Sequence, residues 1–145
     1  MGDVIRIIAN TCMKISSEDN MRVIIKPFVE RLVFDQLKLR SAQTIKQCCT
    51  IIGQNIAIYE GDFKLLEYIE QGLLDELHWV LLQTNAETRK EAIWVLQNLA
   101  CSQASVEKIF QHKCLIPNLL IEIKKHEVTN KAEAAQFFSN LIYSV

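Results

Sequence analysis

Three histidines and five cysteines are the side chains with which this sequence could bind a metal ion or attack a substrate. The histidines stand in no H-x-x-H or H-E-x-x-H pattern, and no two cysteines have the C-x-x-C spacing of a metal knuckle or redox motif. The four glycines are isolated, so there is no glycine-rich phosphate loop and no G-x-S-x-G nucleophile elbow. We therefore expect no catalytic residue, no metal site and no cofactor.

The cysteines lie mostly inside apolar helical patterns, where a free thiol acts as a small buried hydrophobic group in a reducing compartment. They are Cys12, Cys48, Cys49, Cys101 and Cys114. Because the adjacent Cys48 and Cys49 cannot both serve one helix face, we expect one of them to be half exposed.

Composition narrows the class of protein further. The chain has 145 residues, of which 50% are hydrophobic, and its formal net charge is −1. A nucleic-acid binder usually carries a basic excess, so we expect no nucleic-acid partner. No apolar run approaches the ~20 residues of a membrane span, and no signal peptide is visible, so we expect a soluble intracellular protein with no membrane partner. Only two prolines and four glycines occur, which disfavours an all-β fold with many turns.

An asparagine recurs at a nearly constant interval within amphipathic helical segments. Residues 91–100 carry apolar side chains at helical spacing, and Gln54-Asn55-Ile56-Ala57 lies 43 positions before Gln97-Asn98-Leu99-Ala100. Segments with the same frame occur near both ends of the chain. The recurring asparagines are Asn10, Asn55, Asn98 and Asn140.

The material between these long helices repeats as well. Each interval is long enough for a short helix, a bend and a medium helix, with Gly72 allowing a left-handed exit and Asp62 placed to cap a first turn. Pro27 and Pro117 suit the first turn of medium helices. We therefore expect an all-α, right-handed α-α superhelix: one domain over 1–145, with a leftover long helix at 3–16 and three three-helix repeats at 17–60, 61–102 and 103–145.

The chain resembles the armadillo repeat family, and within it is most similar to the importin alpha (karyopherin alpha) proteins. The resemblance covers nearly the whole chain. It rests on Tyr68-Ile69-Glu70-Gln71-Gly72 at a bend, on Ile25-Lys26-Pro27-Phe28 and Cys114-Leu115-Ile116-Pro117 before medium helices, and on residues 90–98 of a long helix.

The resemblance implies a function. In importin-alpha-like proteins the third helices line a concave groove, where W-x-x-x-N pairs hold an extended peptide. An asparagine amide offers a donor and an acceptor to the peptide backbone, and a tryptophan ring packs the stem of a basic side chain. The positions that match are Asn10, Asn55, Asn98 and Asn140 for the asparagines and Trp94 for the aromatic ring; the other aromatic positions hold Arg6, Ile51 and Gln136. The peptide-binding residues implied are thus Asn10, Asn55, Trp94, Asn98, Asn140, Arg6 and Gln136.

Two functions stay open at this point. The first is an adaptor for nuclear protein import, found in cytoplasm and nucleus, that binds a protein or an extended peptide such as a basic nuclear localisation signal. The second is an armadillo scaffold or assembly subunit that binds no such signal and makes its contacts through an apolar or convex patch. For Trp94 itself, packing between repeats is the alternative to a place in the groove. The apolar helix at the end of the sequence leads us to expect either a fragment of a longer solenoid or an end-to-end homodimer.

Overall fold

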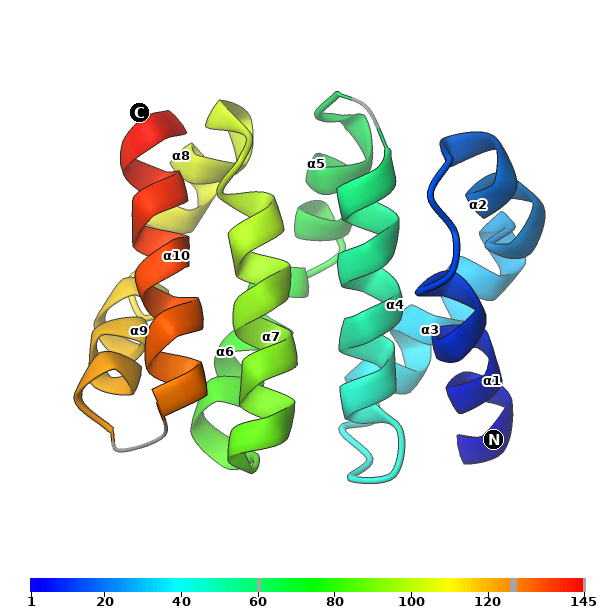
Figure 1. The fold of residues 1–145 in the computed structure, drawn as a ribbon, viewed down its shortest axis with the longest axis horizontal. Coiled ribbons are helices and arrows are strands. Elements are labelled where there is room, and N and C mark those ends of the chain that lie inside the picture. Colours follow the sequence, from blue (N-terminus) through cyan, green and yellow to red (C-terminus); the bar gives the residue numbers. More distant parts are fainter. Residues whose placement is uncertain (60, 126–127, 145) are drawn as a thin grey trace. The chain divides into compact units, whose positions relative to one another are not determined.

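Helices make up most of the computed structural model, which describes residues 1–59, 61–125 and 128–144 (Figure 1). That part of the chain contains ten α-helices and no strand. They are α1 (Gly2–Cys12), α2 (Glu18–Ile24), α3 (Pro27–Lys38), α4 (Ile45–Ile58), α5 (Phe63–Glu70), α6 (Leu73–Gln83), α7 (Ala86–Leu99), α8 (Gln103–Gln111), α9 (Leu115–Lys124) and α10 (Val128–Ser144). The predicted order of one long helix followed by three short–medium–long sets is confirmed.

The chain divides into two compact units, Met1–Glu60 and Gly61–Val145, which we call unit 1 and unit 2. The division falls at the predicted boundary between the first and second repeats. That the two units form a single domain stays a prediction. Among the described residues, no helix combines the length and the apolar character needed to cross a bilayer.

Unit 1 consists of α1 to α4, with α4 packed against both α1 and α3 (Figure 1). Pro27 is the first residue of α3, where its missing N–H leaves no bond unmade. The apolar side chains of α1 that face α4 are fully or almost fully buried, and they are Ile5, Ala9 and Cys12. Helix α1 ends at Cys12 rather than at the predicted residue 16, because the side chain of Ser17 accepts from the amide of Asn20 and begins α2.

Unit 2 holds two complete sets of three helices, α5–α7 and α8–α10. The last helix, α10, packs on α7 and α9, while α6 packs on α7 and α9 (Figure 1). Gly72 lies between α5 and α6 with a φ of 101°, the left-handed conformation expected at this bend. Phe137 of α10 is completely buried and stands edge-on to Phe138, with ring centroids 5.2 Å apart.

Two local predictions are wrong. The carboxylate of Asp62 does not cap α5; it accepts a hydrogen bond from the Ser102 hydroxyl at 2.5 Å, and Ser102 itself caps α8. Cys48 and Cys49 are both completely buried. Helix α4 has buried residues around most of its circumference, so adjacent positions can both be enclosed.

Candidate peptide-binding surface

One stripe of α7 carries the predicted tryptophan and asparagine. Asn85 begins this helix by accepting from the amide of Thr88 at 2.9 Å, and a buried row that includes Ala92, Val95 and Leu99 fixes which side faces the core. The spacing of 3.6 residues per turn then places Glu91, Trp94 and Asn98 together on an adjoining, partly exposed side, which Cys101 continues just after the end of the helix.

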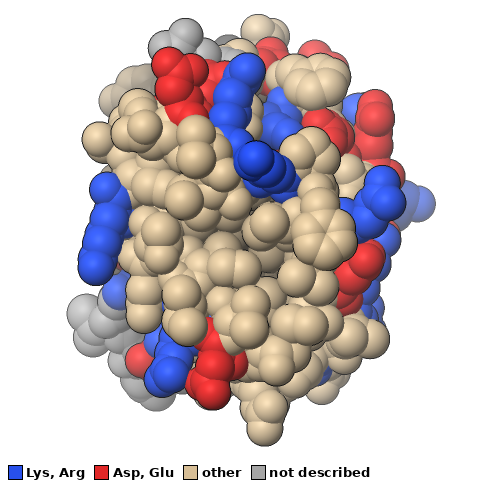
Figure 2. Space-filling model, turned by 90° about the vertical axis from the view of Figure 1, so that its right-hand side faces the viewer, with Lys and Arg blue, Asp and Glu red and all other residues tan. Residues whose placement is uncertain are grey.

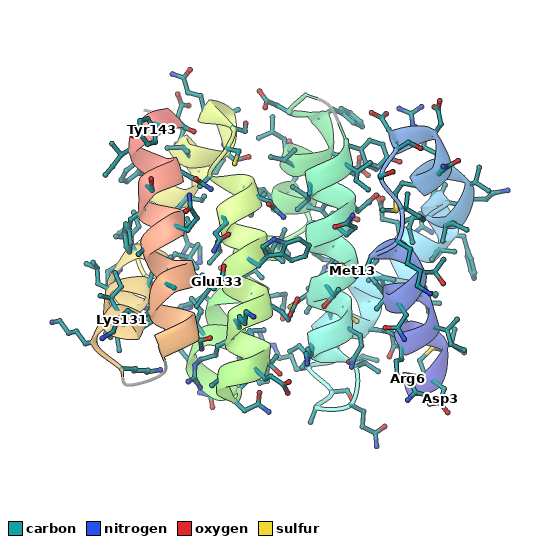
Figure 3. The ribbon with its side chains drawn as sticks, in the orientation of Figure 1. Asp3, Arg6, Met13, Lys131, Glu133 and Tyr143 are labelled. Atoms are coloured by element: carbon teal, nitrogen blue, oxygen red, sulfur yellow. The ribbon has the colours of Figure 1, made fainter. Side chains whose placement is uncertain are left out.

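A matching stripe lies on α10, which runs beside α7. Its members are the repeat equivalents of the α7 residues, 42 positions later: Glu133, Gln136, Asn140 and Tyr143. Figure 3 shows Glu133 toward α7 and Tyr143 near the end of α10. Glu133 and Asn140 are half-buried, whereas Gln136 and Tyr143 are exposed. We call the two stripes together the α7–α10 face.

Side-chain amides join α7 to α10 along the length of their contact. Asn130 donates to the carbonyl of Ala86 at 2.9 Å, and Gln97 donates to the carbonyl of Glu133 at 2.8 Å and to its carboxylate. Toward the other end, the amide of Asn140 donates to the carbonyl of Gln97 at 3.2 Å. The hydroxyl of Ser144 closes the series with a bond of 2.7 Å to the carbonyl of Ala100. These bonds fix the register of the two helices.

The predicted asparagines therefore do not share one environment. Asn140 uses its amide N–H in the series just described, and its amide oxygen accepts from Gln136 at 2.9 Å. Asn98 is half-buried beside Trp94. Asn55 is completely buried in α4 and donates to the carboxylate of Glu30 at 2.9 Å. It therefore differs from the other predicted asparagines, which are exposed or half-buried. Asn10 is exposed on α1.

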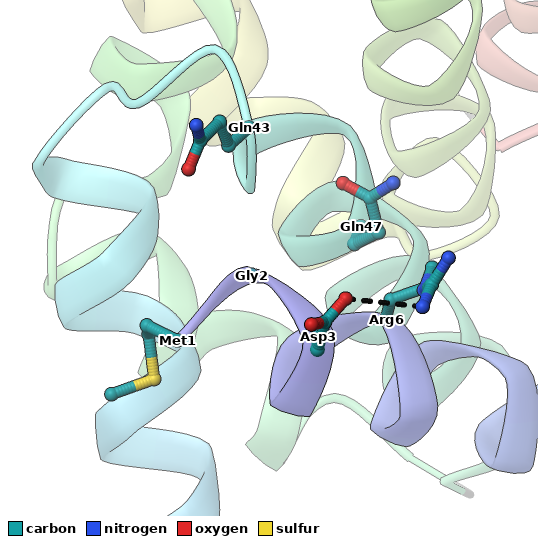
Figure 4. Close-up of a pocket in the computed structure, with 6 residues that line it drawn as sticks. All are labelled: Met1, Gly2, Asp3, Arg6, Gln43 and Gln47. Carbon is teal, nitrogen blue, oxygen red and sulfur yellow. Dashed lines mark hydrogen bonds and ion pairs between the residues drawn. The ribbon is translucent and has the colours of Figure 1, made fainter.

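Arg6 lies at the start of unit 1, where it forms an exposed ion pair with Asp3 at 3.0 Å (Figure 3). The pair borders a hollow of about 460 Å³ between the beginnings of α1 and α4 (Figure 4). Gln43 and Gln47 provide amides on its other side. The carboxylate of Asp3 offsets the charge of Arg6, so this corner of unit 1 presents mainly hydrogen-bonding groups.

The charges of the two units differ in sign. Residues 1–60 contain eight Lys or Arg and six Asp or Glu, a net charge of +2. Residues 61–145 contain eight Lys or Arg and eleven Asp or Glu, a net charge of −3. Two of these acids, Glu91 and Glu133, belong to the α7–α10 face, so cationic ligands are favoured there over anionic ones.

A buried ion pair joins α7 to α9 and was not predicted from the sequence. The guanidinium of Arg89 lies 3.2 Å from the carboxylate of Glu122 on α9, and Arg89 also donates to the carbonyl of Thr84 at 2.7 Å. The Glu122 side chain is only 1% exposed and also pairs with Lys125 at 2.6 Å. The sequence carried a signal for this pair, because Arg89 and Glu122 both occupy core positions of their helices. Charged residues are rarely buried unless they are paired.

His78 and His112 form a second polar cluster in unit 2. His112 pairs with Asp75 at 2.9 Å, and His78 bonds to the amide of Asn118 at 2.7 Å. The two rings stand edge-on, with centroids 5.5 Å apart. Burial, followed by the neighbouring His112, lowers the pKa of His78, and Asp75 opposes the shift. Within the described ranges, no group of His, Cys, Asp and Glu is arranged to hold a metal ion. The cluster ties α6 to the turn after α8 and to α9.

Comparisons with known proteins rest on structure alone. No family model matches the sequence, and no curated protein matches it. Among solved structures, a computationally designed armadillo repeat protein for modular peptide recognition superimposes with a TM-score of 0.82 at 18% identity, over 96% of this chain and 57% of that one. A designed armadillo repeat protein in complex with the peptide (KR)4 gives a TM-score of 0.78 at 17% identity, over 98% of this chain and 62% of that one.

The chain thus spans little more than half the length of these designed proteins. At such low sequence identity the likeness establishes the fold. Together with the observed order of helices, it identifies the fold of this chain as an α-solenoid of the armadillo repeat type.

Proposed function

We propose that this chain is a protein-interaction module that binds an extended peptide along the α7–α10 face. The observation that carries the proposal is the placement of Trp94 one turn before Asn98 on a partly exposed stripe of α7, with Gln136 and Asn140 at the equivalent positions of α10, which packs on α7. An amide can donate to and accept from a peptide backbone, and an indole ring can cover an aliphatic stem.

A basic peptide is the ligand that the charges favour. Unit 2 carries a net charge of −3, and the acids Glu91 and Glu133 belong to the α7–α10 face that also holds Trp94. A cation over an indole face gains about 0.5–2 kcal/mol. The designed armadillo protein in complex with (KR)4 supports the same class of ligand.

From this follows the finer proposal of an importin-alpha-like adaptor in nuclear protein import, present in cytoplasm and nucleus. Its support is the resemblance of the repeats. The aromatic ring of the family pattern is kept only at Trp94, because Arg6, Ile51 and Gln136 occupy the other positions. We therefore propose a peptide site centred on Trp94.

A second candidate is an armadillo scaffold that binds no basic peptide. It is favoured by the internal use of two predicted amides, since Asn55 donates to Glu30 and Asn140 donates to the carbonyl of Gln97. In both candidates the chain acts by binding and catalyses no reaction.

Fluorescence anisotropy with labelled (KR)4 separates the two candidates. We expect saturable binding that weakens as salt rises from about 50 to about 500 mM. Trp94→Ala should weaken it roughly 2- to 30-fold, as expected for the loss of ~0.5–2 kcal/mol. Trp79→Phe, in α6, is the matched control and should leave affinity unchanged. If (KR)4 does not bind at about 1 mM, or binds Trp94→Ala equally well, the scaffold is the better description.

A further inference from the structure

The two units of the chain hold their titratable groups differently. On the side of unit 1 that Figure 2 shows, charged side chains lie at the molecular surface, mainly around a broad uncharged area. In unit 2, His78 and His112 are half-buried, with ring centroids 5.5 Å apart. Because α6 belongs to the second repeat and both His112 and α9 belong to the third, a proton taken up here acts on contacts that join one repeat to the next.

The hydrogen bonds of Asn118 fix the protonation state of His78. The amide nitrogen of Asn118 lies 2.9 Å from the carbonyl oxygen of Cys114 and 2.7 Å from Nε2 of His78. A carbonyl oxygen can only accept, so the nitrogen is a donor and has one N–H for each of the two groups. Nε2 of His78 is therefore an acceptor, and the imidazole is neutral with its proton on Nδ1.

Protonation of His78 turns this hydrogen bond into a contact between two donors. Nε2 then carries a hydrogen and faces the N–H of Asn118 at 2.7 Å. A rotation of the Asn118 amide by half a turn would offer its oxygen to His78, but it would also place that oxygen against the carbonyl of Cys114 and break the bond there. The bond between α6 and α9 is thus stable only while His78 is neutral.

The second histidine makes the cluster more sensitive to acid. His112 lies 2.9 Å from the carboxylate of Asp75, to which its Nε2–H donates. Its Nδ1 is buried and has no hydrogen-bond partner in the described part of the chain. A proton on Nδ1 would be a buried donor without an acceptor, and two charged rings at this separation would repel each other.

Few charges act on His78 from the helices around it. Burial, and after it His112 at the end of α8, lowers the pKa of His78, whereas Asp75, one turn earlier on α6, raises it. Helix α9 presents the neutral Asn118, and its own acid, Glu122, is held in the buried ion pair with α7. Among the described residues, α5 and α7 add no charge that shifts the pKa of His78.

The other bonds described between the second and third repeats contain no histidine. Ser102 donates to Asp62 between α8 and α5, and the side-chain amides join α7 to α10. Histidine is the only side chain whose ordinary pKa lies between pH 5 and 8. Mild acid therefore acts on the contact of α6 with the start of α9 and leaves the long helices joined.

We propose that the cluster of His78, His112, Asp75 and Asn118 is a proton-operated latch between the second and third repeats. As the pH falls from neutral, proton uptake by His78 releases the turn before α9 and the first turn of α9 from α6. The amide bonds keep α10 on α7, so the two repeats turn relative to each other about their long helices. The latch acts in this way whether or not the α7–α10 face binds a peptide.

The first test is the tautomer of His78. At about pH 7.5, the ¹⁵N chemical shifts of the ring should show a proton on Nδ1 and none on Nε2. A proton on Nε2 would overturn the proposal, because Asn118 could then not donate to this atom.

Distances between pairs of spin labels measure the movement. The latch pair is Gln71→Cys and Lys113→Cys, two exposed positions that directly follow the C-terminal ends of α5 and α8 or lie one residue further. The control pair is Lys90→Cys and Ala132→Cys, which report on α7 and α10. The members of each pair are 42 positions apart and so occupy equivalent places in the two repeats.

The labels must attach only at these positions. Both doubly substituted chains therefore also carry Cys101→Ser and Cys114→Ser, which remove the two exposed thiols. The remaining thiols are buried and stay unlabelled. Helical circular dichroism at each pH shows that the chain remains folded.

We expect the latch distance to lengthen by about 1–2 Å between about pH 7.5 and about pH 5, the size of helix shifts at packed interfaces, while the control distance stays unchanged. His78→Gln keeps an acceptor for Asn118 that does not titrate, so it should abolish the lengthening. Asp75→Asn should move the lengthening to lower pH, because the carboxylate of Asp75 raises the pKa of His78.

Three results of the distance measurements would overturn the proposal. The first is an equal latch distance at both pH values in the chain with native His78. The second is the same lengthening in His78→Gln. The third is a lengthening of the latch and control distances together, which would indicate that acid loosens the whole of unit 2.

Discussion

Glu122 of α9 offers a direct test of how the interior of unit 2 holds the α7–α10 face. Its carboxylate is 1% exposed and lies 3.2 Å from the guanidinium of Arg89 and 2.6 Å from the ammonium of Lys125. Glu122→Gln keeps the shape of the side chain but leaves Arg89 with a neutral partner. Removing one member of a buried ion pair typically costs 3–5 kcal/mol, and since Lys125 is 35% exposed and Arg89 keeps its bond to Thr84, we expect about 2–4 kcal/mol here.

Urea unfolding measures this loss in unit 2 itself, because both tryptophans of the chain, Trp79 and Trp94, lie in that unit. With a slope of about 1.5–2 kcal/mol per molar urea, the midpoint of the fluorescence transition should fall by roughly 1–3 M. Glu67→Gln on α5, which removes a within-helix pair with Lys64, is the control and should cost about 0–0.5 kcal/mol. A loss for Glu122→Gln no larger than that of the control would refute the view that this pair holds α9 against α7.

Three further outcomes follow from the structure. Gly72→Ala should lower the free energy of unfolding by about 1–2 kcal/mol, because its φ of 101° strains any Cβ; an unchanged urea midpoint would contradict this. Because the pKa of His78 is lowered in the folded chain, stability should be full above pH 6.5 and fall as the pH drops below that value; His78→Gln should flatten this dependence in urea titrations. A thiol reagent at neutral pH should modify two cysteines quickly, Cys101 and Cys114, since burial raises the pKa of the Cys12 thiol to about 11 and that of Cys48 to about 12; five fast thiols in the native chain would be inconsistent with this.

The sequence alone predicted the order of the helices and several of the residues at which they begin or bend. The recurrence of one asparagine set the repeat length, and Gly72 and Pro27 lie where the backbone needs a left-handed residue and a first-turn proline. These features are local, because each depends on the conformation of one residue or on the period of one helix.

The candidate site was less predictable because it depends on contacts between helices. Asn55 and Asn98 look alike in the sequence, yet Asn55 is enclosed with Glu30, which lies 25 residues away on another helix. Gln97 precedes Asn98 in the repeated pattern and could have been noticed, since Gln54 holds the same place and also donates to a distant carbonyl, that of Ile15. Which amide faces a neighbouring helix depends on helix rotation, which periodicity alone leaves several tens of degrees uncertain.

Four of the bonds that join α7 to α10 end on main-chain oxygens, at Ala86, Gln97, Glu133 and Ala100. A carbonyl group is present whatever side chain its residue carries. Substitutions on the accepting helix therefore leave these bonds intact, provided that the helix keeps its path. The partly exposed positions of α7, such as Glu91 and Trp94, can thus change without a matching change on α10, whereas Asn140 is constrained because it donates one of these bonds from the α10 stripe.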